Sequence, residues 1–167
     1  HLSGRGHGTE VISRRPDVGC DWTMESLMPA VLRADVVVHL AGAGVMDAAW
    51  SPARKLELES SRVETTALLA QACVEASGQG HTPRLVSASA VGYYGPHAHG
   101  EVQEESSPPG EDFLAQLCVK WEAALLVARE AGVPVSVVRI GVVLGADGGA
   151  LKRMLLPFKL CLGGPLG

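Results

Sequence analysis

The chain has 167 residues, of which 47% are hydrophobic and 19% charged, and its formal net charge is −4. This composition excludes a disordered chain, and no apolar run approaches the roughly 20 residues that a membrane helix needs. The acidic balance offers no basic surface to nucleic acid, so we expect one soluble domain with neither a membrane nor a nucleic-acid partner.

The cysteines are scattered and form no Cys-x-x-Cys pair, which is typical of reduced core thiols in an intracellular protein. We therefore expect the cytoplasm rather than an organelle. The pair His97 and His99 resembles a metal clip, but it lies in a polar turn without a nearby cysteine, so a solvated loop is favoured and no metal is expected. The cysteines are Cys20, Cys73, Cys118 and Cys161.

The first eight residues have neither an initiating Met nor the form of a signal peptide. Thr9–Ser13 is predicted as a short strand that runs into Arg14 and Arg15. In a dinucleotide-binding fold the second strand ends at the adenosine ribose, where Arg suits a 2′-phosphate. Ser13 and Arg14 are therefore candidate NADP contacts, and the alternative is a pair of exposed charges before a turn.

A short helix over 23–33, interrupted by Pro29, precedes a strand over 35–40. Its three consecutive valines do not alternate with polar residues, which predicts a central strand buried on both faces. Ala41 and Gly42 follow directly and leave an almost bare backbone. A flat cofactor could lie against Leu40, Ala41 and Gly42.

Ser51 and Pro52 are typical of a helix start, and the helix is predicted to end near Gly78. Glu57 and Arg62 lie five residues apart, hence on different faces, and do not form an obvious pair. A solvated helix face explains them about as well as ligand contact does. The expected buried stripe consists of Val63, Ala67, Ala70 and Val74.

The stretch 84–95 is the clearest candidate site. A short apolar strand ends in the small residues Ser87, Ala88 and Ser89, and glycines then turn the chain. Ligands of open parallel sheets bind outside the carboxyl ends of the strands, so the Ser89 hydroxyl is a candidate catalytic group. The alternative is a strand followed by a polar turn.

A loop over 96–109 leads to a helix capped by Asp112, a strand over 135–139 and a basic helix over 150–162. Strands alternate with helices throughout. This order predicts an α/β fold with helices on both faces of a parallel sheet.

Blocks in family order along the chain resemble the atypical extended short-chain dehydrogenase/reductases, specifically their NAD(P)-dependent epimerase-like family. The blocks are Ser13-Arg14, His39-Leu-Ala-Gly42, Ser61-Arg-Val-Glu-Thr-Thr66, Ser87-Ala-Ser-Ala-Val-Gly-Tyr-Tyr-Gly95, Lys120-Trp-Glu122, Arg139-Ile-Gly-Val-Val-Leu-Gly145, Leu155-Leu-Pro-Phe158 and Gly163-Gly-Pro165.

The resemblance implies a Rossmann-like doubly wound parallel sheet, NADP as cofactor, and a small-molecule substrate. A homodimer is a further expectation. By the same resemblance, Ser13 and Arg14 would bind the 2′-phosphate, and Leu40, Ala41 and Gly42 would contact the nucleotide. Glu57 and Arg62 would make further contacts with the cofactor, and Ser89 would contact the substrate oxygen.

Family members begin with a strand and a Gly-x-x-Gly-x-x-Gly turn, whereas residues 1–7 align with the end of the following helix. We therefore expect residues 1–167 to be a partial NAD(P)-binding domain without its first strand and glycine-rich loop. We also expect the C-terminal substrate domain to be mostly absent and dinucleotide binding by this chain to be poor.

The Tyr-x-x-x-Lys that is usual in the superfamily is also missing, and the relatives that this chain resembles are atypical here too. The two positions fall on Leu114 and Cys118, or in a shifted register on Gln116 and Lys120. Two functions stay open: an NADP-dependent epimerase-like oxidoreductase, and a cofactor-binding sensor or interaction protein without turnover. The two phenols of 93–94 could substitute as acid and base, although packing on the sheet edge is favoured.

Overall fold

The computed structural model describes residues 3–13, 22–97 and 101–145, together with residues 151, 155 and 159. Arg14 and most of the helix expected over 150–162 lie outside these residues. Within the described ranges, no helix is long and apolar enough to span a membrane.

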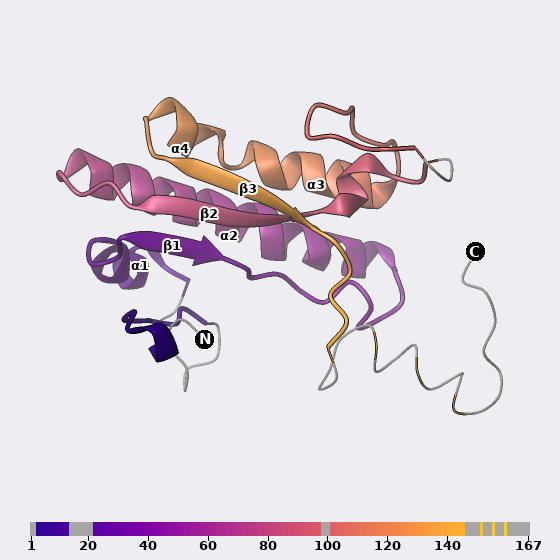
Figure 1. Ribbon diagram of the computed structural model, residues 1–167, viewed down its shortest axis with the longest axis horizontal. Helices are drawn as coiled ribbons and strands as arrows, with labels where there is room; N and C mark the ends of the chain where they lie inside the picture. Colours follow the sequence, from indigo (N-terminus) through magenta and orange to yellow (C-terminus); the bar gives the residue numbers. More distant parts are fainter. Residues whose placement is uncertain are drawn as a thin grey trace.

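In the part of the chain that the structure describes, three strands alternate with the helices and form one parallel sheet in the order β1-β2-β3 (Figure 1). The α/β fold with a parallel sheet is therefore confirmed. In chain order the elements are η1 (Ser3–Arg5), α1 (Met24–Val31), β1 (Val36–His39), α2 (Pro52–Gly78), β2 (Arg84–Ala90), η2 (Val91–Tyr94), α3 (Phe113–Ala123), α4 (Leu126–Glu130) and β3 (Val135–Ile140).

Side-chain caps start the helices where the sequence predicts them. The Ser51 hydroxyl accepts a hydrogen bond from the Arg54 amide, and Pro52 occupies the first turn of α2. Asp112 caps α3 by accepting from two backbone amides, those of Leu114 and Ala115. These caps fix the ends of α2 and α3 that lie nearest the candidate site.

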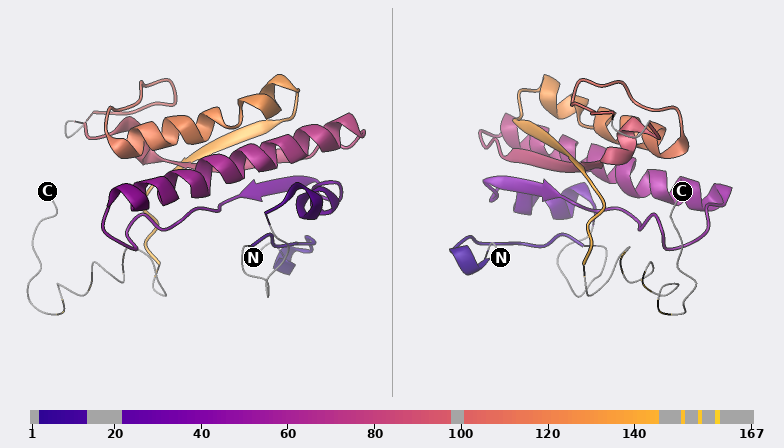
Figure 2. Two further views of the ribbon diagram at one scale, coloured as in Figure 1. Left: turned by 180° about the vertical axis from the view of Figure 1, so that it is seen from behind. Right: turned by 45° about the vertical axis from the view of Figure 1, so that its right-hand side comes forward.

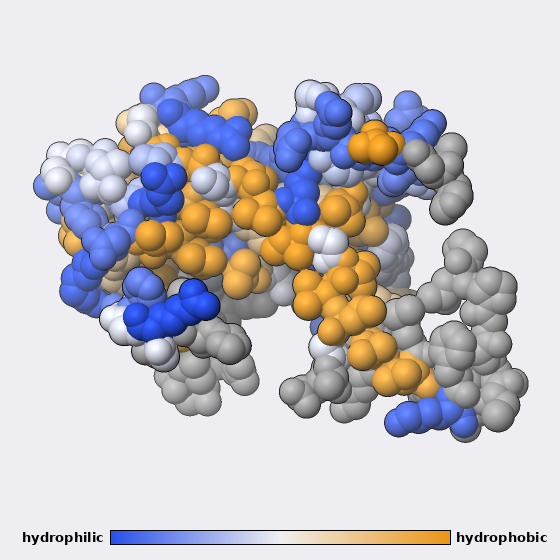
Figure 3. All heavy atoms as spheres, in the orientation of Figure 1, coloured by the Kyte–Doolittle hydropathy of each residue, from blue (hydrophilic) through white to orange (hydrophobic). Residues whose placement is uncertain are grey.

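Helices α1 to α4 all pack on one face of the sheet (Figures 1 and 2). Val37 and Leu85 point into this core, while Val36, Val38 and Val138 on the opposite face are about half exposed. Orange spheres gather over that face in Figure 3. The prediction that β1 is buried on both faces is wrong, because the helices of the described residues cover only one of them.

Two finer predictions are also wrong. The predicted strand over Thr9–Ser13 does not form: only Ile12 makes a β-bridge. The Ile12 side chain packs on the core, while Val11 is largely exposed. An apolar pattern makes a strand only where neighbouring strands offer a ladder of hydrogen bonds.

The buried face of α2 also differs from the predicted stripe, of which only Ala70 is buried. Because α2 packs against α1, α3, α4 and β2, its buried face is broad and includes small polar side chains. Its buried residues are Leu58, Ser61, Thr66, Leu69, Ala70, Ala72, Cys73 and Ala76.

Candidate functional site

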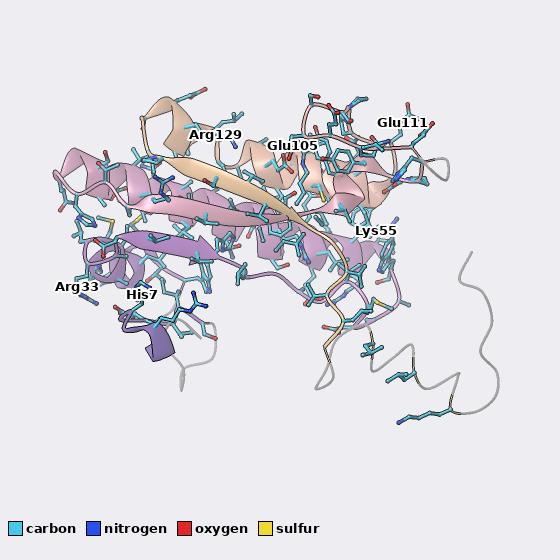
Figure 4. All side chains as sticks on the ribbon, viewed as in Figure 1. His7, Arg33, Lys55, Glu105, Glu111 and Arg129 are labelled. Carbon is cyan, nitrogen blue, oxygen red and sulfur yellow. The ribbon has the colours of Figure 1, made fainter. Side chains whose placement is uncertain are left out.

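The carboxyl ends of the three strands point toward the same end of the molecule (Figure 1). There the loop after β1, the turn η2 and the loop that contains Glu105 follow the strands, and Lys55 marks the adjacent start of α2 (Figure 4). Loops at this end of a parallel sheet form the usual ligand crevice.

Side chains of α2 hold the loop after β1 in place. The Ala43 amide donates to the Ser61 hydroxyl over 3.0 Å, and Arg62 Nη2 donates to the Ala43 carbonyl over 2.9 Å. A Cβ at Gly42 would lie 3.0 Å from Arg62 Cζ, so glycine allows the guanidinium to approach. Leu40 is 68% exposed. The loop thus presents a small, fixed surface outward.

Arg62 and Glu57 both support this loop. Arg62 also donates to the Leu58 carbonyl over 3.1 Å, and burial lowers the pKa of the guanidinium. Glu57 accepts from Arg54 Nη1 over 2.6 Å, while Arg54 Nη2 donates to the Gly44 carbonyl. The structure therefore pairs Glu57 with Arg54, in agreement with the expectation that Glu57 and Arg62 are not partners.

Ser89 lies at the interface of β2 and α3 and is only 3% exposed. Its hydroxyl donates to Glu122 Oε1 over 2.6 Å. The same carboxylate accepts from Arg139 through both oxygens, with Nε and Nη2 each at 2.9 Å. The candidate catalytic hydroxyl is thus the first member of a Ser89–Glu122–Arg139 network.

The network is ionised. Burial by itself raises the pKa of Glu122, but the hydrogen bonds from Arg139 and Ser89 outweigh it and hold the pKa below its usual value. In turn, the hydrogen bonds to Glu122 raise the pKa of Arg139. The pair therefore carries both charges at neutral pH.

Arg139 also contacts the aromatic turn. Its Nη1 donates to the Tyr94 hydroxyl over 3.0 Å and to the Glu105 carbonyl over 3.2 Å. The guanidinium carbon lies 3.4 Å from the Tyr93 ring centroid, within the range of a cation–π contact. One side chain thus joins β3, α3, η2 and the loop that contains Glu105.

Sequence reasoning did not single out Glu122 or Arg139 as site residues. Both residues belong to sequence blocks that resemble the family, and this was the only feature of the sequence that could have indicated them. Their pairing depends on the side-by-side placement of α3 and β3, and residue spacing does not show it.

Helix α3 carries no phenol–ammonium pair. Cys118, at the expected lysine position, is buried, and burial raises the pKa of its thiol. Lys120, in the shifted register, donates instead to the Glu59 carboxylate over 2.8 and 3.0 Å. Of the two candidate 2′-phosphate contacts, Ser13 is half-buried and Arg14 lies outside the described residues.

Comparisons with known proteins agree with this architecture. Epimerase family protein SDR39U1 of the mouse is 41% identical over 99% of this chain and 56% of its own length. The crystal structure of human SDR39U1 (isoform 2) with NADPH has a TM-score of 0.81, 38% identity, and 99% and 56% coverage of the two chains. A nucleoside-diphosphate sugar epimerase of Corynebacterium glutamicum has a TM-score of 0.76, 34% identity, and 97% and 34% coverage.

A parallel sheet with alternating helices and a site at its carboxyl end defines a Rossmann-like α/β protein. Residues 2–158 match the model of the NAD dependent epimerase/dehydratase family, and the chain belongs to that family. It spans about half the length of the mouse and human relatives.

Proposed function

We propose that the protein is an NADP(H)-binding, epimerase-like oxidoreductase of the extended short-chain type, with a small-molecule substrate yet to be identified. The observation that carries this proposal is the loop after β1, which α2 holds with its small, exposed surface toward the carboxyl end of the sheet. The human relative, 38% identical, was crystallised with NADPH.

The described residues fit such a cofactor. Leu40, Ala41 and Gly42 offer a surface with little side chain, and Gly42 could not carry a Cβ without displacing Arg62. In this proposal Glu57 and Arg62 act through the loop that they support. NADP(H), when bound, supplies or accepts a hydride.

Ser13 and Arg14 are the proposed 2′-phosphate contacts. The test is calorimetric titration of NADPH and NADH into the longest form of the protein that its gene encodes. A charge-assisted phosphate contact contributes about 1.5–3 kcal/mol, so NADPH should bind at least about tenfold more tightly than NADH. Arg14→Ala should remove the preference, and the control Arg33→Ala should keep it. Equal affinities for the two cofactors in the unmodified protein would contradict the proposal.

The alternative is a cofactor-binding protein without turnover. Leu114 and Cys118 favour it, because neither can replace the usual tyrosine and lysine. Single-turnover hydride transfer from NADPH to a panel of carbonyls and nucleotide sugars separates the two functions. Binding without transfer to any member of the panel would favour the sensor.

We further infer that residues 1–167 belong to the NAD(P)-binding domain and that the protein is an intracellular homodimer. The family membership supports the first inference. Sedimentation of the longest encoded form tests the dimer, and a single monomeric species at micromolar concentration would contradict it.

A further inference from the structure

The oxidoreductase proposed above needs a proton donor, because a carbonyl that accepts a hydride must also gain a proton on oxygen. Helix α3 offers none at the expected positions. Leu114 has no proton to give, and the Cys118 thiol is buried between the helix and the sheet.

Ser89 is not the donor either. Its hydroxyl hydrogen is given to Glu122 Oε1 over 2.6 Å, and a hydroxyl has one hydrogen to donate. Arg139 keeps Glu122 ionised, so this hydrogen bond persists at neutral pH. Ser89 can therefore only accept a further hydrogen bond.

The Tyr94 hydroxyl has the opposite arrangement. Its oxygen accepts from Arg139 Nη1 over 3.0 Å, and among the described residues nothing accepts its hydrogen. Tyr94 is half-buried in η2, which follows the carboxyl end of β2 and packs against α3 and β3. A phenol with an uncommitted hydrogen and a cation at its oxygen thus lies at the crevice end of the sheet.

We propose that Tyr94 is the proton donor of the reduction and that Arg139 takes the part of the usual lysine. A hydride forms the new C–H bond at the substrate carbonyl carbon, and the C=O π electrons move to oxygen. That oxygen takes the Tyr94 hydrogen, which leaves an alcohol, oxidised NADP and a tyrosinate. Arg139 stabilises the tyrosinate until water returns a proton, and oxidation of an alcohol runs through the same steps in reverse.

Tyr93 provides the matched control. It is the neighbouring phenol, it contacts the same guanidinium, and it does so through its ring face rather than its oxygen. Replacing either residue by Phe keeps the ring and removes only the hydroxyl. The two variants therefore differ in which oxygen is lost.

The first test needs neither cofactor nor substrate. Because Arg139 Nη1 donates to the Tyr94 oxygen but the guanidinium meets Tyr93 only at its ring, tetranitromethane should nitrate Tyr94 several-fold faster than Tyr93 in the 167-residue chain, as followed by peptide mass. Arg139→Gln should reduce this ratio. Equal nitration of the two phenols in the unmodified chain, or preferential nitration of Tyr93, would overturn the proposal even if the variant failed to fold.

The second test uses NADPH and the carbonyl panel with the longest encoded form. Tyr94→Phe should lower the single-turnover rate by about 100-fold or more and leave NADPH affinity unchanged, while Tyr93→Phe should change neither. A Tyr94→Phe variant as fast as the unmodified protein would overturn the role of Tyr94. NADPH binding without any transfer by the unmodified protein, or no NADPH binding, would instead overturn the proposed oxidoreductase; the nitration ratio would then still test the Tyr94–Arg139 pair.

Discussion

Ser89 and Glu122 lie 33 residues apart in the chain and share a hydrogen bond of 2.6 Å. This contact fastens the carboxyl end of β2 to α3, and Arg139 extends it to β3. The positions of Ser89 and Arg139 at this end of the sheet therefore depend on one carboxylate.

Glu122→Gln should destabilise the fold. The amide removes the negative charge and turns one hydrogen-bond acceptor toward Arg139 into a donor. Both side chains are less than a fifth exposed, so the expected loss is about 2–4 kcal/mol in the free energy of unfolding. Urea denaturation followed by circular dichroism measures it.

The control is Glu59→Gln, which removes the ion pair between Glu59 and Lys120. These side chains are 34% and 55% exposed, so the loss should stay below about 1 kcal/mol. Equal losses for the two variants would contradict a central role for Glu122.

Ser89→Ala should cost about 1.5–3 kcal/mol in stability, because it removes a buried hydrogen bond to a charged group. Ser87→Ala is the matched control two residues earlier on β2. The Ser87 hydroxyl is also buried but donates to a neutral carbonyl, that of Ala88, so about 1 kcal/mol is expected. A Ser89→Ala variant no less stable than Ser87→Ala would show that the contact with Glu122 is weak.

The sequence predicted the elements with local signals and missed those that depend on tertiary partners. Ser51 with Pro52, and Asp112, fix helix starts through neighbouring amides, so both were predictable. Ile12 depends on a partner strand, and Val38 on a second layer of helices. Patterns within a segment do not contain that information.

The candidate site divides in the same way. Ser89 was predicted from its place at the end of a strand, but its partners Glu122 and Arg139 come from two other elements. Gly42 was predicted as bare backbone, whereas the reason for glycine is the approach of Arg62. Residue type indicated where the site lies, and the three-dimensional packing determined which atoms meet.

Gly110→Ala should destabilise the protein by about 1–3 kcal/mol. A Cβ at this position would lie 2.7 Å from Gly95 Cα and 2.9 Å from the Tyr94 carbonyl oxygen, and backbone atoms cannot rotate away. The variant therefore tests how closely the loop packs on η2. Gly78→Ala at the end of α2 is the control, because nothing lies within 4 Å of its added Cβ and Ala favours the helix. Equal melting temperatures of the Gly110→Ala and Gly78→Ala variants would show that the loop that contains Glu105 does not pack closely on η2 at Gly110.

His39 should make stability depend on pH. It is 2% exposed, its Nε2 lies 2.8 Å from Thr66 Oγ1, and Trp121 Nε1 donates to the same oxygen. Burial lowers the pKa of His39 to about 4 from 6.5. The folded chain therefore holds a neutral imidazole at a pH where the unfolded chain binds a proton.

The sign follows from proton binding. Between pH 6.5 and about 4, His39 binds a proton in the unfolded state but not in the folded state. The free energy of unfolding therefore falls as the pH falls. The slope approaches about 1.4 kcal/mol per pH unit, or about 3 kcal/mol over the whole window. The Glu122 carboxylate stabilises the fold less only as the pH falls below 4.5, the pKa of Glu122 in the unfolded state, and that range lies outside most of this window. Urea denaturation at a series of pH values measures the slope, and His39→Gln should flatten it. If the free energy of unfolding of the His39→Gln variant changed with pH as steeply as that of the unmodified chain, a group other than His39 would be responsible.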